Sequence, residues 1–359
     1  DTHLTLSFPG ADAGAGFHEL MPYIQGMCIV NQSYCETILS DPNEDLGLNV
    51  DGTGSYMLES VSDNGDVTLT RFADSWAPAS IETIYCKYLT GSQETAFEAG
   101  DLDYAVYGAT NYAIIQGFDN VQTQEQVLNG IVYLINNCVE GQPLSDKRVR
   151  DAAAHCLNIE DIAAIASSGA GTPAYNIATP LVEYYADVAE HVTVDVEAAN
   201  ALMTEAGYSE SNPLPIRLIV VSSYPDWVSA CEVVKEMLEQ SYFSVTIEQV
   251  ADTSRYTTQD FDMAMISVGL TTKFNSYAQL YDDSTGLNQS GIDDPDVQAA
   301  FAAMTDEATT QAAMKAATES RAYIPIYYPT TFFAFDANVN PGPYYTQFSA
   351  FMYRDFSWK

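Results

Sequence analysis

Polar and apolar residues alternate with the period of a β-strand over the first part of the chain. The alternation from His3 to Phe8 predicts a strand, and Gly52–Arg71 predicts a hairpin that turns at Asp63-Asn64-Gly65. Apolar residues with the spacing of a helix are rare before Leu134. We therefore expect the N-terminal portion of the protein to be rich in strands.

Helical spacing begins beyond Leu134. Val149, Ala152, Ala153 and Cys156 share one helical face and predict an amphipathic helix that begins near Ser145. Further helices are predicted from their capping residues, which are Asn158, Asp195 with Gly207 at the C-terminal end, and Asp294-Pro295. A last helix is expected to end near Arg321.

Strand-length apolar runs alternate with these helices. Ile216–Val221 and Val245–Val250 flank a predicted helix over residues 226–240, and Phe261–Val268 follows. A strand, helix and strand in succession predict a crossover unit in a sheet covered by helices on both faces. Tyr323–Phe335 predicts a returning strand. The fold class expected from this pattern is α/β.

Length and composition extend the expectation to domains. The 359 residues, 47% of them hydrophobic, supply enough apolar material for a large core. We expect two lobes joined by short crossings. Their boundaries are 1–125 for a β-rich, partial first lobe, 126–322 for an α/β second lobe, and 323–359 for a return strand and tail that pack on the first lobe.

The charge narrows the range of partners. Forty-nine acidic residues against 13 basic ones give a net charge of -36. Such a field repels phosphate backbones, so no nucleic-acid partner is expected. An acidic protein of this kind fits an extracellular or cell-surface setting. The longest apolar runs are of strand length, too short for a transmembrane helix.

Catalytic and metal-binding motifs are weak throughout. His18-Glu19 lacks the second histidine of a zinc-protease helix, and the acidic loop Asp41–Gly47 lacks the glycine and glutamate of a calcium loop. The Gly-x-Gly pairs lack the rest of a dinucleotide fingerprint. We therefore expect no cofactor and no metal. An extracellular hydrolase that uses a carboxylate pair stays open as an alternative, because many carboxylates are present and no spacing singles out two of them.

The six cysteines leave two arrangements open. Cys28 and Cys35 are close enough in sequence to form a bridge, and Cys138 and Cys156 flank a polar loop. Buried free thiols are the alternative, and sequence alone does not fix connectivity.

A series of short motifs runs in one order along nearly the whole chain. Gly52–Leu58 reads Gly-Thr-Gly-Ser-Tyr-Met-Leu, and Val67–Arg71 and Asp74–Trp76 follow it. The later motifs are Phe97–Ala105, Leu144–Ala152, Gly171–Tyr175, Ala199–Tyr208, Asp260–Met263 and Ile324–Tyr328. In content and order they resemble the motifs of the peptide/nickel class of extracellular solute-binding proteins, which serve ABC importers.

The resemblance implies a two-lobed fold of the periplasmic-binding-protein type, class II. It also implies a non-enzymatic receptor that captures a small ligand, peptide-like or another small polar solute, and delivers it to an ABC permease in the membrane. The location that it implies is extracellular, either as a cell-surface lipoprotein or in the periplasm. A surface adhesin built on the same scaffold is a further alternative.

Two departures from the family pattern bear on these expectations. The family's N-terminal part of the first lobe and its small extra domain, which precede the strand that His3–Phe8 resembles, are missing from this sequence. We expect an exposed sheet edge as a result, and dimerisation through that edge is a hypothesis. The stretch Gly269–Tyr277 lacks the Asp with which the family binds a peptide amino group, which argues against recognition of ordinary peptides.

The resemblance places the ligand between two lobes that close on it, and three parts of the chain supply candidate contacts. One part follows the crossing into the second lobe, one is a loop that matches the family, and one is the polar loop after a buried strand, where open α/β sheets bind ligands. The predicted residues are Tyr133, Asn136, Asn137, Tyr175, Thr271, Thr272, Lys273, Phe274, Asn275 and Tyr277. For the first four residues, the alternative is an ordinary role in strand, turn or loop packing.

Overall fold

The computed structural model describes residues 32–40, 52–187, 191–270, 272–283, 286–346 and 350–359. The predicted strand at His3–Phe8 lies outside these residues. The chain forms two compact units, which are described separately. Unit 1 contains the described residues up to Glu125 together with Phe332–Lys359, and unit 2 is Gln126–Thr331.

A six-stranded sheet forms the centre of unit 2, with strand order β7-β11-β6-β10-β8-β9. β8 pairs in parallel with both β9 and β10, whereas β6 pairs antiparallel with β10 and β11. The parallel pair β8 and β9 with the intervening α8 confirms the predicted crossover unit. The strands are β6 (Gly130–Asn136), β7 (Thr172–Pro173), β8 (Leu214–Val221), β9 (Phe243–Val250), β10 (Met263–Gly269) and β11 (Tyr323–Tyr328).

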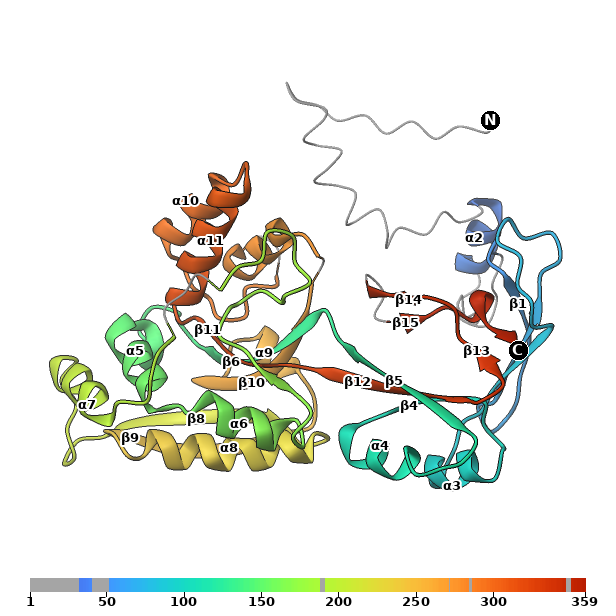
Figure 1. Ribbon diagram of the computed structural model, residues 1–359. Helices are drawn as coiled ribbons and strands as arrows, with labels where there is room; N and C mark the ends of the chain where they lie inside the picture. The colour runs from blue at the N-terminus through green and yellow to red at the C-terminus, as the bar shows by residue number, and fades with distance from the viewer. Residues whose placement is uncertain (1–31, 41–51, 188–190, 271, 284–285, 347–349) are drawn as a thin grey trace. The chain divides into compact units, whose positions relative to one another are not determined.

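Every residue of β6 is buried, because helices cover both faces of this sheet. Val132 and Leu134 face a core shared with α5 to α8, and Ile131, Tyr133 and Ile135 face a second core shared with α10 and α11. Figure 1 shows α6 and α8 on the side of the sheet opposite to α10 and α11. Each fully buried aliphatic side chain stabilises the unit by about 1.5–3 kcal/mol.

The helices of unit 2 begin close to the predicted caps. Asn158 accepts hydrogen bonds from the backbone N–H groups of Glu160 (3.1 Å) and Asp161 (3.3 Å), as a capping residue does. The φ of +98° at Gly207 confirms the predicted left-handed C-cap. The helices are α5 (Lys147–Cys156), α6 (Ile159–Ala166), α7 (Val196–Glu205), α8 (Pro225–Leu238), α9 (Ser254–Thr257), α10 (Pro295–Ala302) and α11 (Glu307–Glu319), with 3₁₀-helices η1 (Pro143–Ser145) and η2 (Phe274–Tyr281).

Unit 1 contains two three-stranded sheets, β1-β2-β3 and β4-β12-β5. The hairpin of β1 and β2 turns at Gly65, whose φ is +92°, as predicted. An aromatic core forms where Phe333 and Phe335 of β12 pack with Phe351. The strands are β1 (Tyr56–Val61), β2 (Val67–Arg71), β3 (Thr83–Cys86), β4 (Tyr104–Tyr107), β5 (Val121–Val127), β12 (Thr330–Asp336), β13 (Val339–Asn340), β14 (Tyr344–Tyr345), β15 (Ala350–Phe351) and β16 (Ser357–Trp358). The helices are α2 (Gln32–Leu39), α3 (Gln93–Glu98), α4 (Ala109–Ile115) and the 3₁₀-helix η5 (Tyr353–Asp355).

The return strand lies elsewhere than expected. The predicted strand at Tyr323–Phe335 is two strands, and β11 pairs with β6 inside unit 2. Residues 323–331 therefore belong to unit 2, whereas we expected the segment from residue 323 onward to pack on the first lobe. The reason is that β6 needs a hydrogen-bonding partner on each side, and β11 supplies the second one.

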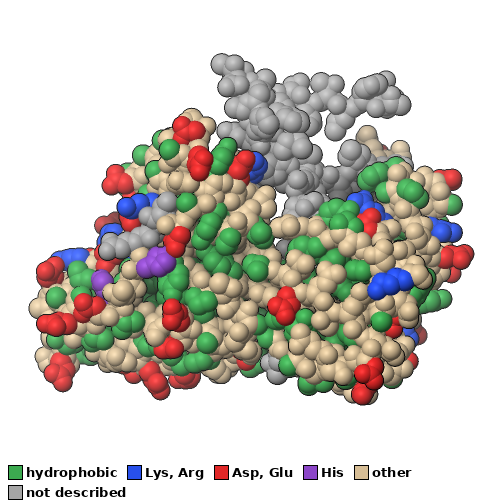
Figure 2. Space-filling model, viewed as in Figure 1, with side chains coloured by type: hydrophobic (Ala, Val, Ile, Leu, Met, Phe, Trp, Pro, Cys, Tyr) green, Lys and Arg blue, Asp and Glu red, His purple; other side chains and the backbone are tan. Residues whose placement is uncertain are grey.

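The surface of the protein reflects its acidic composition. Figure 2 shows acidic side chains spread over the viewed face and more numerous there than basic ones. Among the described residues, no helix combines the length and apolar character that crossing a membrane demands.

Cys138 and Cys156 are free thiols, so the bridge considered between them is not formed. Cys28 lies outside the described residues.

Candidate ligand-binding site

The predicted site residues at the end of β6 lie in the interior of unit 2. Tyr133, Asn136 and Asn137 are all 0% exposed. The Tyr133 hydroxyl donates to the carbonyl oxygen of Ile177 (2.5 Å), and Asn136 Nδ2 donates to that of Arg321 (2.6 Å). These side chains join β6 to neighbouring segments, and their burial gives no support to the prediction that they contact a ligand.

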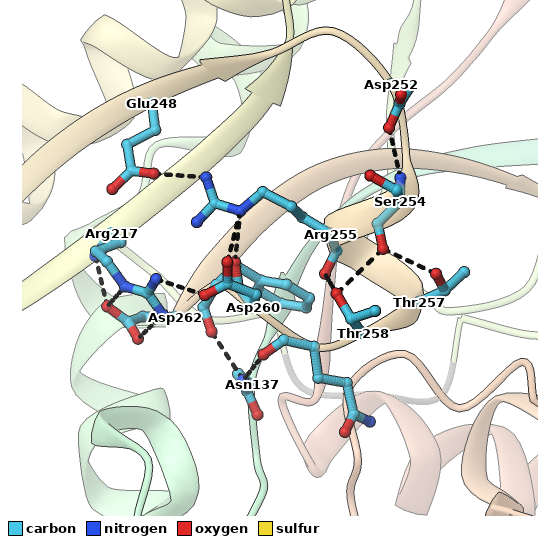
Figure 3. Close-up of polar contacts among 12 residues, drawn as sticks. Asn137, Arg217, Glu248, Asp252, Ser254, Arg255, Thr257, Thr258, Asp260 and Asp262 are labelled. Carbon is cyan, nitrogen blue, oxygen red and sulfur yellow. Dashed lines mark hydrogen bonds and ion pairs between the residues drawn. The ribbon is translucent and has the colours of Figure 1, made fainter.

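Asn137 has a structural role of the same kind. Its Nδ2 donates to the carbonyl oxygens of Gln259 (2.9 Å) and Phe261 (2.7 Å), which fixes the chain where it enters β10. Figure 3 shows the bonds of Asn137 and, separately, those of Arg217 to Asp260 and Asp262. Arg217 pairs with Asp260 (2.8 Å) and Asp262 (3.3 Å). The Asp260–Met263 motif is thus anchored by a charged network and an amide.

The predicted loop after β10 is partly buried. Thr271 lies outside the described residues, and Thr272, Lys273 and Asn275 are partly exposed. Phe274 and Tyr277 are 3% and 2% exposed, and their rings stack with centroids 5.0 Å apart. These two aromatic side chains anchor η2 in the core, because burial of large apolar rings is strongly stabilising.

Glu183 connects this loop to the segment after β7. Its carboxylate forms an ion pair with the Lys273 ammonium group, and its backbone N–H donates to the carbonyl oxygen of Thr272 (2.9 Å). Lys273 is therefore neutralised by a neighbouring acid. The structure brings Thr272 and Lys273 together with the 179–187 segment, which begins a few residues after Tyr175.

Asn129 holds the same two segments from a third side. Its Nδ2 donates to the carbonyl oxygen of Leu270 (2.5 Å), and its Oδ1 accepts from the hydroxyl of Thr179 (2.8 Å). Thr179 is fully buried. Because an amide that is paired at both ends fixes the geometry of its partners, the half-buried Asn129 sets the spacing between the Leu270 carbonyl and the Thr179 hydroxyl.

Tyr175 lies at a pocket of about 370 Å³ on unit 2. Its ring stacks on His191 with centroids 4.2 Å apart, and its hydroxyl lies 3.3 Å from a carboxylate oxygen of Glu160. The pocket is lined by Val127, Thr172, Pro173, Tyr175, Pro180, Leu181, Tyr185, Asp187 and Tyr328. Apolar and aromatic walls with a few polar groups are typical of small-molecule sites.

The hydroxyls of Tyr185 and Tyr328 at this pocket are hydrogen-bonded to each other. Tyr328 donates to the carbonyl oxygen of Ala178 (3.1 Å), so its oxygen is left to accept from Tyr185 at 3.3 Å. Burial, together with the bond to Tyr185, raises the pKa of Tyr328 well above its ordinary value. Burial and the Glu160 carboxylate likewise raise the pKa of Tyr175. These two hydroxyls therefore stay protonated at neutral pH.

Among the described residues that line this pocket, Asp187 is the one with a carboxylate. Asp187 is exposed and lies 2.6 Å from the Nε2 atom of His191. Tyr185, Asp187 and Tyr328 were missed by the sequence analysis. Their signal was weak, because Tyr328 belongs to the apolar return-strand motif and Tyr185 sits in a loop without a motif.

Comparison with proteins of known sequence finds related receptors. The dipeptide-binding protein of Escherichia coli (strain K12) is 26% identical over 184 residues, which are 50% of this chain and 34% of that protein. The chain thus spans about a third of the length of this curated relative.

Comparison with solved structures addresses the fold. The ABC transporter substrate-binding protein CtaP of Listeria monocytogenes matches with a TM-score of 0.80 and 16% identity over 92% of this chain and 71% of that one. DppA of Helicobacter pylori, solved in complex with the peptide STSA, matches with a TM-score of 0.77 and 16% identity over 92% of this chain and 68% of that one. These likenesses confirm the expected α/β, two-lobed periplasmic-binding-protein fold.

The family is shown by a direct match. The family model for bacterial extracellular solute-binding proteins, family 5 (Middle), matches residues 1–291, which is well over half of the chain. That match agrees with the resemblance found in the sequence motifs. The chain therefore belongs to the family 5 bacterial extracellular solute-binding proteins.

Proposed function

We propose that this protein is a receptor that captures a small solute outside the cytoplasm and passes it, chemically unaltered, to an ABC permease. The observation that carries this proposal is the family match over residues 1–291. Proteins of this family bind peptides or other small ligands, and they act outside the cell or in the periplasm. The location that we propose is extracellular, either as a cell-surface lipoprotein or in the periplasm.

The pocket beside Tyr175 is the part of unit 2 that we propose contacts the ligand. Its tyrosine and proline walls favour an apolar or aromatic group of the ligand, and the Tyr175 and Tyr185 hydroxyls supply polar contacts. Asp187 binds His191 through Oδ2, and its Oδ1 can accept a charge-assisted hydrogen bond from a cationic ligand group. Thr272, Lys273 and Asn275, on the adjoining loop, extend the proposed contact surface.

The loop after β10 has no acidic side chain that could bind the free amino group of a peptide. No Asp occurs in the stretch 269–277, and Lys273 is paired with Glu183. A carboxylate that is already occupied by a lysine offers little to a ligand ammonium group. We therefore propose that the ligand is recognised mainly through an apolar part and through a cationic group near Asp187. A free α-amino group contributes less to its binding.

A thermal-unfolding series tests this proposal. The protein is heated in the presence of a casein digest and, separately, of the same digest acetylated on its amino groups. Ligand at about 100 times its dissociation constant stabilises the folded state by about 2.7 kcal/mol. A rise in melting temperature with either digest, and recovery of the peptides uncut, supports a receptor. Cleaved peptides would instead support the hydrolase.

We also propose that the 359-residue chain self-associates through an open sheet edge of unit 1. An unpaired strand edge exposes rows of backbone donors and acceptors that another chain can pair with. Size-exclusion chromatography with light scattering over a range of protein concentrations measures this directly, and a monomer at every concentration would contradict it.

A further inference from the structure

Three residues that line the pocket beside Tyr175 carry polar side chains whose own hydrogen bonds leave only acceptors for a ligand. They are Tyr175, Tyr185 and Asp187, and all three belong to unit 2. A hydroxyl group has one proton to donate and two lone pairs that accept. Where a protein group already takes that proton, a ligand meets an acceptor only.

The proton of the Tyr185 hydroxyl is taken by Tyr328. The Tyr328 hydroxyl donates to the buried carbonyl oxygen of Ala178 at 3.1 Å, so in its contact with Tyr185 (3.3 Å) it is the acceptor. Tyr328 is buried, whereas Tyr185 is partly exposed. The Tyr185 oxygen therefore offers lone pairs, and no proton, to a ligand in the pocket.

The Tyr175 hydroxyl is used in the same way. It donates to a carboxylate oxygen of Glu160 at 3.3 Å, and an ionised carboxylate only accepts. Glu160 belongs to α6 and is not among the described residues that line the pocket. The Tyr175 oxygen is thus a second acceptor, and its ring is held by the stack on His191.

Asp187 supplies a third acceptor and the negative charge. Its Oδ2 binds His191, and its Oδ1 can accept from a ligand. Burial is the main cause that raises the pKa of Tyr175 and that of Tyr328, and the charge of Asp187 raises both further. The carboxylate therefore lies close to the Tyr175 hydroxyl and to the bonded pair of Tyr185 and Tyr328, so these groups can act on one ligand group.

Hydrogen-bond donors are scarce among the described residues that line the pocket. Pro173 and Pro180 have no backbone N–H. The N–H groups of Leu181 and Tyr185 donate within the protein. The Thr172 hydroxyl can rotate and accepts as readily as it donates. No lysine or arginine occurs in this part of the lining, so an anionic ligand group would meet acceptors and a negative charge.

We propose, on the basis of the receptor role stated above, that this pocket selects a guanidinium or primary ammonium group at the end of an apolar chain. Both groups are cationic and carry hydrogen-bond donors without acceptors, which matches the acceptors of Tyr175, Tyr185 and Asp187. The apolar chain packs on the proline and leucine side chains of the wall. The selected feature is the N–H donor as well as the charge.

A quaternary ammonium group is the alternative that the aromatic walls alone would accept. Such cations are attracted to the faces of tyrosine rings. A trimethylammonium group has the same charge as a guanidinium but no N–H, so it would cover the oxygens of Tyr175, Tyr185 and Asp187 without pairing them. A site built to bond a ligand donor rejects an analogue that lacks it, because the polar groups of the site are then left unpaired.

Four probes with one butyl chain test this selectivity by isothermal titration calorimetry at neutral pH and low ionic strength. They are n-butylguanidinium, n-butylammonium, n-butyltrimethylammonium and pentanoate. We expect the guanidinium and ammonium probes to bind at least about tenfold more tightly than the trimethylammonium probe, and pentanoate not to bind. Equal affinities for the guanidinium and trimethylammonium probes, preference for pentanoate, or no binding of any probe would overturn the proposal.

Tyr185→Phe tests the hydroxyl itself, because it removes the acceptor and keeps the ring. We expect about tenfold weaker binding of n-butylguanidinium, with the affinity for n-butyltrimethylammonium within about twofold of the parent. Tyr184→Phe is the matched control, since this neighbouring tyrosine is 44% exposed and does not line the pocket. It should leave both affinities unchanged. Unchanged guanidinium binding by Tyr185→Phe, or equal losses for both probes, would overturn the proposal.

Peptides retained from a casein digest separate this proposal from the receptor role. If both are right, the protein retains uncut peptides that are enriched in lysine or arginine relative to the digest. Uncut peptides without that enrichment would overturn the selectivity and leave the receptor role standing. Peptides recovered cleaved would contradict the receptor role, while the butyl probes would still decide the selectivity of the pocket.

Discussion

Asn129 and Thr179 are joined by a hydrogen bond of 2.8 Å between the amide oxygen and the hydroxyl. The other end of the same amide donates to the carbonyl oxygen of Leu270. One side chain thus ties together the two segments that carry Tyr175 and the loop after β10. The proposed ligand surface of unit 2 depends on this tie, because Leu270 and Thr179 themselves lie outside the strands of the sheet.

Replacing Asn129 tests that dependence. Asn129→Ala removes the side-chain donor to the Leu270 carbonyl and the acceptor of the Thr179 hydroxyl, which keeps only the bond from the Leu181 N–H. We expect this to cost about 1–3 kcal/mol of unfolding free energy. Urea unfolding measures the loss. As a control, Asn338→Ala changes an exposed amide in a turn of unit 1, and we expect a change below about 0.5 kcal/mol. A neutral Asn129→Ala would show that other contacts set the two segments.

Asn137 should prove structural rather than ligand-binding. Asn137→Ala removes two buried hydrogen bonds to the backbone that leads into β10, and we expect about 2–4 kcal/mol of destabilisation. At a temperature where the variant stays folded, its ligand affinity should stay within about threefold of the parent. A large loss of affinity with little loss of stability would restore Asn137 to the ligand site.

Tyr175 should show the opposite behaviour. Tyr175→Ala removes a partly exposed ring from the pocket wall, and we expect about tenfold weaker ligand binding with a small change in stability. Tyr224→Ala is the matched control, because Tyr224 is also a stacked tyrosine of unit 2 but does not line the pocket. Isothermal titration calorimetry compares the two variants. Equal affinities would show that the pocket does not contact the ligand.

The charged network at the start of β10 predicts a pH effect. Hydrogen bonding to Arg217, with the nearby charge of Arg255, lowers the pKa of Asp260 below its ordinary value. A carboxyl group whose pKa is lower in the folded state stabilises the fold above its unfolded pKa, and this contribution is lost as the pH falls through the folded pKa.

We therefore expect Asp260→Asn to weaken the dependence of stability on pH below about pH 4. Urea unfolding at several pH values between neutral and acidic measures it. Glu210→Gln, which changes an exposed loop carboxylate of the same unit, should leave the pH profile as it is. If both variants keep the parent's profile, the contacts of Asp260 do not contribute to acid stability.

Local signals in the sequence predicted much of unit 2. Asn158 and Gly207 mark helix ends through the hydrogen-bonding and backbone conformation of those residues alone, and both predictions are confirmed. The place of β11 was not predictable in this way. The run from Tyr323 to Phe335 is apolar apart from Thr330 and Thr331, and periodicity does not reveal which sheet offers a strand partner.

The ligand-binding predictions show a different limit. Asn136 and Asn137 follow a buried strand, and polar residues at that position are as well suited to buried backbone carbonyls as to a ligand. Tyr185 and Tyr328 come from segments more than a hundred residues apart and meet through their hydroxyls. Only the folded chain brings them to the pocket that also contains Tyr175.

Native mass spectrometry of the protein purified from cells grown in rich medium tests the central claim most directly. We expect a non-covalent complex with a small solute, which is released intact when the protein is unfolded and rebinds when the protein is refolded. A solute that is recovered cleaved, or that disappears on incubation while a product accumulates, would contradict the account of a receptor that leaves its ligand unaltered.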